Sequence, residues 1–158
     1  MIRVKYSPDG RWIAASGANG FVKIWNAENH AEVTVLRGLR EFVFGLSFSR
    51  DSQLLAAADS EGVIRLWKAG SWEEHLTFAA HHHLIHRVDF SPDGRILASG
   101  SLDQTIKLWE TRDGSLLETL HGHRGRITSV AFSSTGSLLA SASLDGTVER
   151  FGTPSGWN

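Results

Sequence analysis

The sequence predicts an all-β fold built from four copies of one sheet module. A repeat is the first observation, because Trp25, Trp67 and Trp109 follow one another at intervals of 42 residues. A tight turn recurs at the same interval, with SPDG at 7–10, SRDS at 49–52, SPDG at 91–94 and SSTG at 133–136. Each copy also contains short apolar segments separated by turn residues, and no segment keeps a helical period. Motifs that share one period indicate a repeat architecture.

The third copy shows how each element is expected to form. A strand is predicted near 86–90, and the SPDG that follows is a turn, because proline fixes φ and glycine permits positive φ. The apolar segment RILASG predicts a second strand. In TIKLW, Ile106 and Leu108 lie on one face and Trp109 on the other, which is typical of a third strand. A polar turn and SLLETL then predict a fourth strand.

The other copies follow the same pattern, with four strands in each except the last. Four strands in roughly 40–45 residues form the unit of a β-propeller blade. A fourth strand is doubtful in the last copy, because Pro154 and two glycines follow its third strand. The predicted strands lie at 2–6, 11–16, 21–25 and 32–36, then 43–48, 53–58, 63–67 and 73–78, then 86–90, 95–99, 105–109 and 115–120, and finally 127–132, 137–142 and 147–151. The corresponding blades are 1–37, 38–79, 80–121 and 122–158, within a single domain that spans 1–158.

These residues resemble the WD-repeat β-propeller family. The resemblance is carried by SPDG and LASGSLDQTIKLW at 91–94 and 97–109 and by GH at 122–123, and it covers nearly the whole chain. In that family a His, a Ser, an Asp and a Trp form a hydrogen-bonded structural tetrad, which would satisfy a buried indole N–H. The resemblance assigns the tetrad to His81, Ser99, Asp103 and Trp109 in the third copy, to His123, Ser141 and Asp145 with Phe151 in place of Trp in the fourth, to Trp67 with Leu39, Ala57 and Glu61 in the second, and to Trp25 with Ala15 and Asn19 in the first.

Four blades leave the predicted ring open. The family implies blades shaped for a ring of seven or eight, so four give about half a propeller. Three alternatives follow: two chains that close into an eight-bladed ring as a dimer with twofold symmetry, a piece of a longer propeller, or a strained four-bladed monomer. The dimer is favoured, because each end of a half ring would otherwise expose an apolar sheet face. The residues expected on these faces include Val4, Ile13, Val22, Ile24, Ile127, Leu139 and Val148.

The amino-acid composition argues against several classes of partner and of chemistry for this chain. The chain has 16 basic and 17 acidic residues, so it lacks the basic surplus with which proteins bind nucleic-acid phosphates. It has no cysteine, which excludes disulfides and thiolate catalysis and fits a reducing, cytoplasmic location. No apolar run approaches the roughly 18 residues of a membrane span, and the first ten residues lack the apolar segment of a secretory signal. We therefore expect no nucleic-acid and no membrane partner.

No motif indicates catalysis, a cofactor or a metal. The nucleophile motif G-x-S-x-G, the phosphate-binding loop and the dinucleotide-binding glycine motif in its strand-to-helix context are all missing. The histidines of HHHLIH, which include His82, His83 and His86, are dense enough to suggest zinc or nickel. His81 is already assigned to the tetrad, however, and no Cys or carboxylate pair completes a ligand set. We expect no enzyme activity, no cofactor and no metal site.

Recognition is expected on the loops, because a rigid scaffold can position them against a partner. If the strands of a blade are lettered a to d, the d–a connections and the b–c turns share one edge of the propeller. Arginine and aromatic side chains on this edge are typical interface anchors. The candidate partner-binding residues are Arg40, Phe42, His82, His83, Leu102, Arg124 and Arg126. The sequence thus predicts a non-catalytic scaffold that binds a protein or peptide, with an acidic or phosphorylated peptide near Arg124 and Arg126 as one hypothesis. The alternative is a ligand- or partner-sensing regulatory module truncated from a larger signalling protein.

Overall fold

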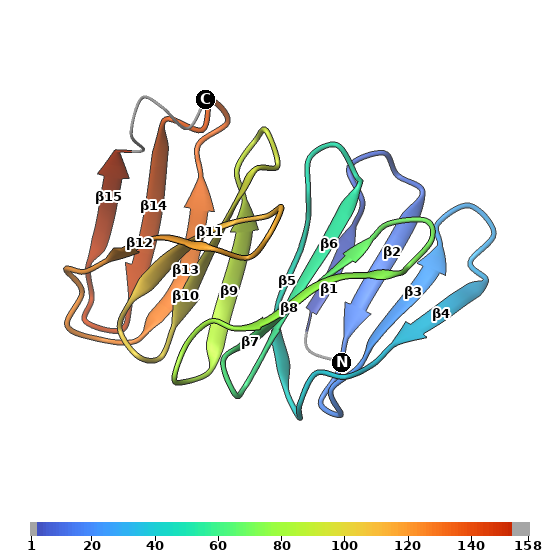
Figure 1. The fold of residues 1–158 in the computed structure, drawn as a ribbon, viewed down its shortest axis with the longest axis horizontal. Helices are drawn as coiled ribbons and strands as arrows, with labels where there is room; N and C mark the ends of the chain where they lie inside the picture. Colours follow the sequence, from blue (N-terminus) through green and yellow to red (C-terminus); the bar gives the residue numbers. More distant parts are fainter. Residues whose placement is uncertain (1–2, 153–158) are drawn as a thin grey trace.

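Short strands joined by tight turns make up the structure. The computed structural model describes residues 3–152, and that range contains fifteen strands and no helix. The strands form four antiparallel sheets, three with four strands and one with three (Figure 1). The predictions of an all-β fold and of four repeated sheets are confirmed. No helix within residues 3–152 has the length and apolar character needed to cross a membrane.

Each sheet is a meander in which consecutive strands pair. The first contains β1 (Arg3–Tyr6), β2 (Trp12–Ser16), β3 (Val22–Asn26) and β4 (Glu32–Leu36). The second contains β5 (Val43–Phe48), β6 (Leu54–Asp59), β7 (Val63–Lys68) and β8 (Glu74–Ala79). The third contains β9 (Ile85–Phe90), β10 (Ile96–Ser101), β11 (Ile106–Glu110) and β12 (Leu116–Leu120), and the fourth β13 (Ile127–Phe132), β14 (Leu138–Ser143) and β15 (Val148–Gly152). The doubtful strand after β15 would fall on residues outside the described range.

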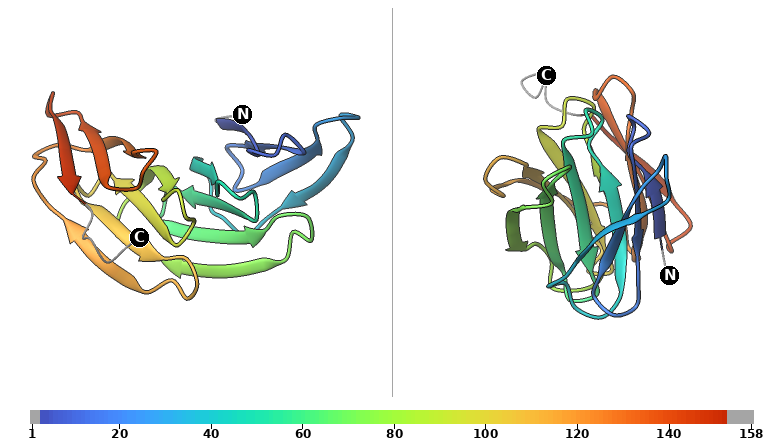
Figure 2. Two further views of the ribbon diagram at one scale, coloured as in Figure 1. Left: turned by 90° about the horizontal axis from the view of Figure 1, so that it is seen from above. Right: turned by 90° about the vertical axis from the view of Figure 1, so that its right-hand side faces the viewer.

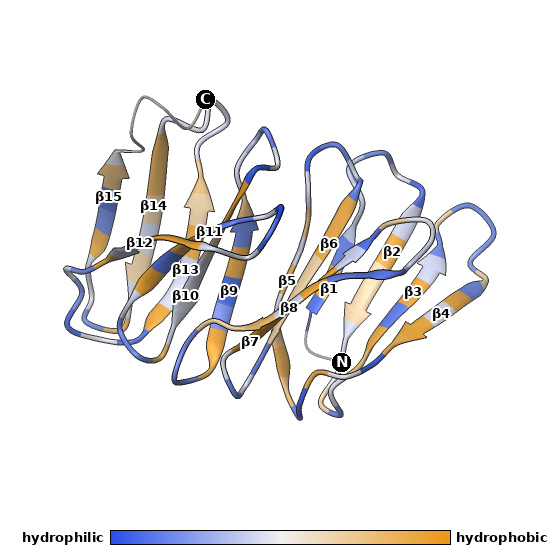
Figure 3. Ribbon diagram, in the orientation of Figure 1, coloured by the Kyte–Doolittle hydropathy of each residue, from blue (hydrophilic) through white to orange (hydrophobic). Residues whose placement is uncertain are grey.

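The four sheets lie side by side along an arc, and we refer to them as blades 1 to 4. The first strand of each blade (β1, β5, β9 and β13) lies on the concave side, and β4, β8 and β12 lie on the convex side (Figure 2). The inner strands of neighbouring blades contact one another. Hydrophobic residues are concentrated on the strands, whereas most turns are hydrophilic (Figure 3). The arrangement is that of propeller blades occupying part of a ring.

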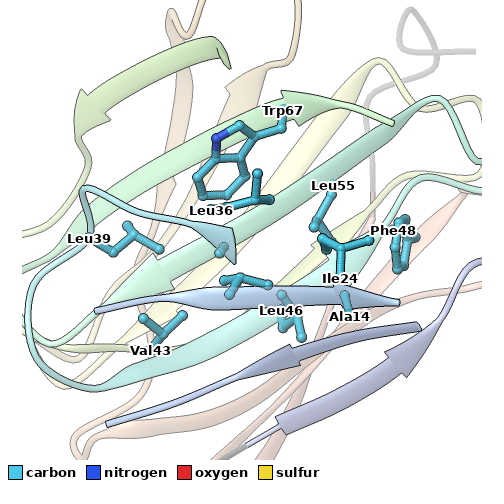
Figure 4. Packing of buried hydrophobic residues seen from close by; sticks show 11 residues of the cluster. Ala14, Ile24, Leu36, Leu39, Val43, Leu46, Phe48, Leu55 and Trp67 are labelled. Carbon is cyan, nitrogen blue, oxygen red and sulfur yellow. The ribbon is translucent and has the colours of Figure 1, made fainter. Parts of the chain in front are cut away.

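One hydrophobic cluster fills each junction between neighbouring blades. At the first junction, Ile24 of β3 packs with Leu46 of β5 and Leu55 of β6, and all three are buried (Figure 4). Residues 42 and 84 positions further along repeat this arrangement at the next two junctions: Leu66, Val88 and Leu97, and then Leu108, Val130 and Leu139. Burial of one such side chain contributes about 1.5–3 kcal/mol, so each blade depends on its neighbour for stability.

The two ends of the arc expose part of the surface that the junctions bury. Val4 is 51% exposed and Val148 is 72% exposed, whereas Leu46 and Ile64, which stand at the same repeat positions, are almost completely buried. The prediction was wrong for four other residues, which lie inside junctions: Val22, Ile24, Ile127 and Leu139. Every strand in the middle of a blade carries apolar residues, so the sequence pattern does not show which face meets a neighbouring blade and which lies at an end of the arc.

Candidate functional site

Four side chains of blade 3 form a continuous hydrogen-bonded chain. Trp109 Nε1 donates to Ser99 Oγ at 2.8 Å, and Ser99 Oγ lies 2.7 Å from His81 Nε2. His81 Nδ1 lies 2.8 Å from Asp103 Oδ2. Because an ionised carboxylate only accepts hydrogen bonds, His81 donates from Nδ1 and accepts the Ser99 hydroxyl proton at Nε2. The chain ties the connection before β9 to strands β10 and β11, deep in the blade.

The electrostatics of this network agree with those hydrogen-bond directions. Burial lowers the pKa of His81, although the hydrogen bond and the charge of Asp103 partly oppose that shift. Burial by itself raises the pKa of Asp103, but hydrogen bonds from His81 and Thr105 outweigh it and hold that pKa well below its usual range. A neutral imidazole next to an ionised carboxylate follows. The polar atoms of the four side chains hydrogen-bond to one another, as a structural role requires.

Blade 4 contains a shorter version of the same network. His123 Nε2 lies 2.8 Å from Ser141 Oγ, while His123 Nδ1 lies 3.1 Å from Asp145 Oδ2 and 2.9 Å from Thr147 Oγ1. The hydrogen bond from Thr147 is the largest of several that hold the pKa of Asp145 well below its usual range. Phe151 stands at the tryptophan position and brings no indole N–H to the serine. The network therefore ends at Ser141.

Blade 2 relies on an aspartate to which no sequence motif pointed. Asp59 is fully buried, and its carboxylate accepts three backbone N–H groups. The donors are Arg40 at 2.8 Å, Glu61 at 3.0 Å and Val63 at 3.0 Å. In blade 3 the equivalent turn bonds are shared between Ser101 and Asp103. Asp59 thus accepts the backbone hydrogen bonds that Ser101 and Asp103 accept in blade 3. The sequence feature that could have indicated this role is an acid at the repeat position of Ser101, two residues before Glu61.

Three of the four tetrad positions of blade 2 carry apolar side chains. Leu39, Ala57 and Trp67 are all buried and belong to the cluster between blades 1 and 2. Replacing His and Ser together by Leu and Ala leaves no imidazole or hydroxyl unsatisfied in the core. In blade 1, Trp25 is only half-buried, because it lies at the end of the arc. The structure therefore brings the polar tetrad residues together within blade 3 and within blade 4. Trp67 packs in an apolar cluster instead, and Trp25 lies half-buried at the end of the arc.

The predicted partner-binding residues gather where the d–a connections meet the b–c turns, and we call this the loop edge. Backbone hydrogen bonds join the two kinds of segment, from Leu102 N to Leu84 O at 2.9 Å and from Leu144 N to Arg126 O at 3.0 Å. Phe42 is 44% exposed, whereas Leu102 is half-buried. The other five candidates are exposed: Arg40, His82, His83, Arg124 and Arg126. The structure thus presents six of the seven side chains to solvent.

The histidine run is divided among three environments, of which the exposed loop edge holds His82 and His83. His81 belongs to the tetrad, and the ring of His86 stacks on that of Phe44, with centroids 5.6 Å apart and planes 12° apart. Within residues 3–152, no three His, Cys, Asp or Glu side chains are grouped as a metal ion requires.

Comparison with known proteins identifies the repeat. The family model described as WD domain, G-beta repeat (WD40) matches residues 2–26, 31–68, 72–110 and 114–149. Each match after the first begins near the outer strand of one blade and ends in the third strand of the next, so the sequence repeat links neighbouring blades. A comparison with curated proteins gave no significant match. Because the four matched segments cover most of the sequence, the chain belongs to the WD40 repeat family.

Proposed function

We propose that this chain is a non-catalytic scaffold that binds a protein or peptide partner through its loop edge. WD40 repeats are commonly protein-interaction scaffolds. The observation that carries the proposal is the exposure of Arg40, Phe42 and Arg126 on connections that buried networks hold in place. A protein partner is favoured over nucleic acid because the formal net charge of the chain is −1. A chain without cysteine also suits the reducing cytoplasm.

Preorganisation of the loop edge supports this function. The backbone N–H of Arg40 donates to buried Asp59, and the backbone N–H of Arg124 donates to Asp145 at 2.7 Å. His81 and His123, which lie in the d–a connections before β9 and β13, bond to buried Ser99 and Ser141 and so hold these two connections against their blades. A binding surface that is already ordered loses less conformational entropy when a partner docks. The buried networks therefore serve the function indirectly, by holding the exposed side chains.

An array of immobilised peptides tests this proposal. We expect Phe42→Ala or Arg126→Ala to weaken binding of the retained peptides by about 10-fold or more, as for interface anchors. Arg95→Ala is the matched control, because the Arg95 side chain is 71% exposed but lies on the opposite edge, in the turn after β9. Equal retention by all three variants, or retention of no peptide by the unaltered chain, would rule out the loop edge as the binding surface.

We further propose that two chains, each with blades at 1–37, 38–79, 80–121 and 122–158, close into an eight-bladed ring. The support is the exposure, at the two ends of the arc, of apolar residues whose repeat equivalents inside the arc are buried. Tyr6 is 63% exposed, but its repeat equivalents Phe48 and Phe90 are 8% and 6% exposed. At the other end, Leu138 is 43% exposed, and its equivalent Ile96 is 4% exposed. A neighbouring blade at each end would bury these positions as it does inside the arc.

The two end faces are counterparts within the repeat. At the first junction, Phe48 of blade 2 packs in one cluster with Val22 and Ile24 of blade 1. In the repeat, Tyr6 of blade 1 is the equivalent of Phe48. Val148 and Arg150 of blade 4 are the equivalents of Val22 and Ile24. A twofold rotation would pair the end of each copy with the start of the other, so that both faces are covered at once. Arg150 would then lie against an aromatic ring of the second copy, an arrangement that cation–π attraction favours.

A further inference from the structure

Strands β1, β5 and β9 lie next to one another on the concave side of the arc (Figure 2), and side chains from all three interact there. Arg3 of β1 reaches towards blade 2, where its Nε donates to the backbone carbonyl of Phe44 in β5 at 3.2 Å. The Phe44 ring stacks on His86 of β9, and Arg87 follows His86 on the same strand. Residues from blades 1, 2 and 3 therefore meet at one level of the concave edge.

This edge has a local surplus of positive charge, although the chain as a whole is nearly neutral. Strands β1, β5, β9 and β13 carry the cations Arg3, Lys5 and Arg87 but only one carboxylate, Asp89. Asp89 also accepts the backbone N–H of Phe132 at 2.8 Å. Burial lowers the pKa of Arg3, and the charge of Arg87 lowers it further. The two guanidinium groups are thus close enough to repel each other.

Several hydrogen-bond donors of these side chains are unused. Within the described part of the chain, the Arg3 side chain bonds only through Nε, and the Arg87 side chain makes no hydrogen bond or ion pair. His86 Nδ1 is buried and has no hydrogen-bond partner among these residues. Burial, followed by the charge of Arg3, lowers the pKa of His86, with the backbone of Thr128 partly opposing the shift. A bound anion would give the guanidinium donors of Arg3 and Arg87 an acceptor, and its charge would favour the protonated imidazole of His86, in which Nδ1 donates.

We propose that Arg3, His86 and Arg87 form a binding site for an oxyanion, a carboxylate or phosphate group, presented by an acidic segment of a protein partner. This inference rests on the proposed scaffold function and specifies the chemistry of the partner. Guanidinium groups suit the ligand, because their planar donors match the paired oxygens of a carboxylate or phosphate. The Phe44 ring supports His86 from one side, and the peptide backbone of Phe44 orients Arg3. All four residues come from one chain, so the site does not depend on ring closure.

Fluorescence anisotropy with three labelled peptides tests the site directly. The probes are hexaglutamate, a phosphoserine peptide of equal length, and hexaglutamine as the neutral peptide. We expect at least one anionic peptide to bind and hexaglutamine not to bind, and the tighter of the two anionic peptides identifies carboxylate or phosphate as the source of the oxyanion. Arg87→Gln is expected to weaken that binding by about 10-fold, as for loss of a charge-assisted hydrogen bond. Arg112→Gln, which removes the same charge from a side chain that is 85% exposed in the turn after β11, is expected to change it by less than about twofold.

A thermal melt of the same samples separates binding from folding. The Arg87 side chain has no hydrogen-bond partner in the described residues, and its repulsion by Arg3 opposes its attraction to Asp89, so Arg87→Gln is expected to change the melting temperature little. Arg3→Gln serves as the second binding variant. Failure of both anionic peptides to bind, or equal losses in Arg87→Gln and Arg112→Gln, would overturn the site. If peptides retained on the array depended on Arg126 but not on Arg87, the scaffold function would stand and this inference alone would fail.

Discussion

Replacing Trp109 by alanine is expected to lower the free energy of unfolding by about 3–5 kcal/mol, as for other buried aromatic deletions. The side chain is only 5% exposed, and the ring of Phe78 lies with its centroid 5.0 Å away. The substitution also removes the donor that holds Ser99, so that the end of the His81 network loses its anchor. Denaturant unfolding followed by fluorescence of the remaining tryptophans measures the loss.

Trp25→Ala is the matched control, because Trp25 occupies the same repeat position in blade 1. Its side chain is half-buried at the end of the arc, so less packing is lost when both substitutions are compared in a variant that does not dimerise. We therefore expect a clearly smaller decrease in the free energy of unfolding. An equal decrease for the two variants would show that Trp109 gains nothing from its junction and its hydrogen bond.

Asp59→Ala is expected to lower the free energy of unfolding by about 3 kcal/mol. The carboxylate is the acceptor for three backbone N–H groups, and each buried donor left unsatisfied costs about 1–3 kcal/mol. Part of that cost is expected to be recovered because water can reach the turn beside exposed Glu61. The loss should be accompanied by faster amide hydrogen exchange at Arg40 and Val63, the residues whose N–H groups lose their acceptor.

Glu61→Ala provides a sharp comparison, because Glu61 and not Asp59 aligns with Asp103 in the repeat. Glu61 is exposed, and substitution of such a residue usually changes stability by less than about 0.5 kcal/mol. Asp59→Asn, which keeps one acceptor oxygen, is expected to fall between the two alanine variants. If Glu61→Ala proved as destabilising as Asp59→Ala, the assignment of the turn to Asp59 would be wrong.

The sequence alone predicts most of the fold, because its signals are local and repeated. Turn residues such as those of SPDG at 91–94 recur at a fixed interval, and each observed strand lies within two residues of its predicted bounds. The orientation of the end faces was not predictable from the same signals. Val22 and Ile24 are buried and alternate with half-buried Lys23 and Trp25, and only the neighbour across the junction decides which face is covered.

The candidate sites divide in the same way. His81 and Asp103 could be assigned because residue type and spacing in the repeat match a known family motif. Asp59 could not, because one acid at a shifted position replaces two side chains and follows no motif. The repulsion between Arg3 and Arg87 was also not predictable from the sequence. It acts between residues of blades 1 and 3, which only the curvature of the arc brings together.

Light scattering over a dilution series tests most directly whether the apolar ends of the arc are covered by a second copy. We expect the unaltered chain to have the mass of two chains and to dissociate only on strong dilution. Val148→Asp is expected to give the mass of one chain, because it places a charge on the end face, whereas Leu144→Asp, at a side chain that is 69% exposed on the loop edge, should leave the dimer intact. A mass of one folded chain at every concentration, with the same value for both variants, would contradict ring closure by a second copy.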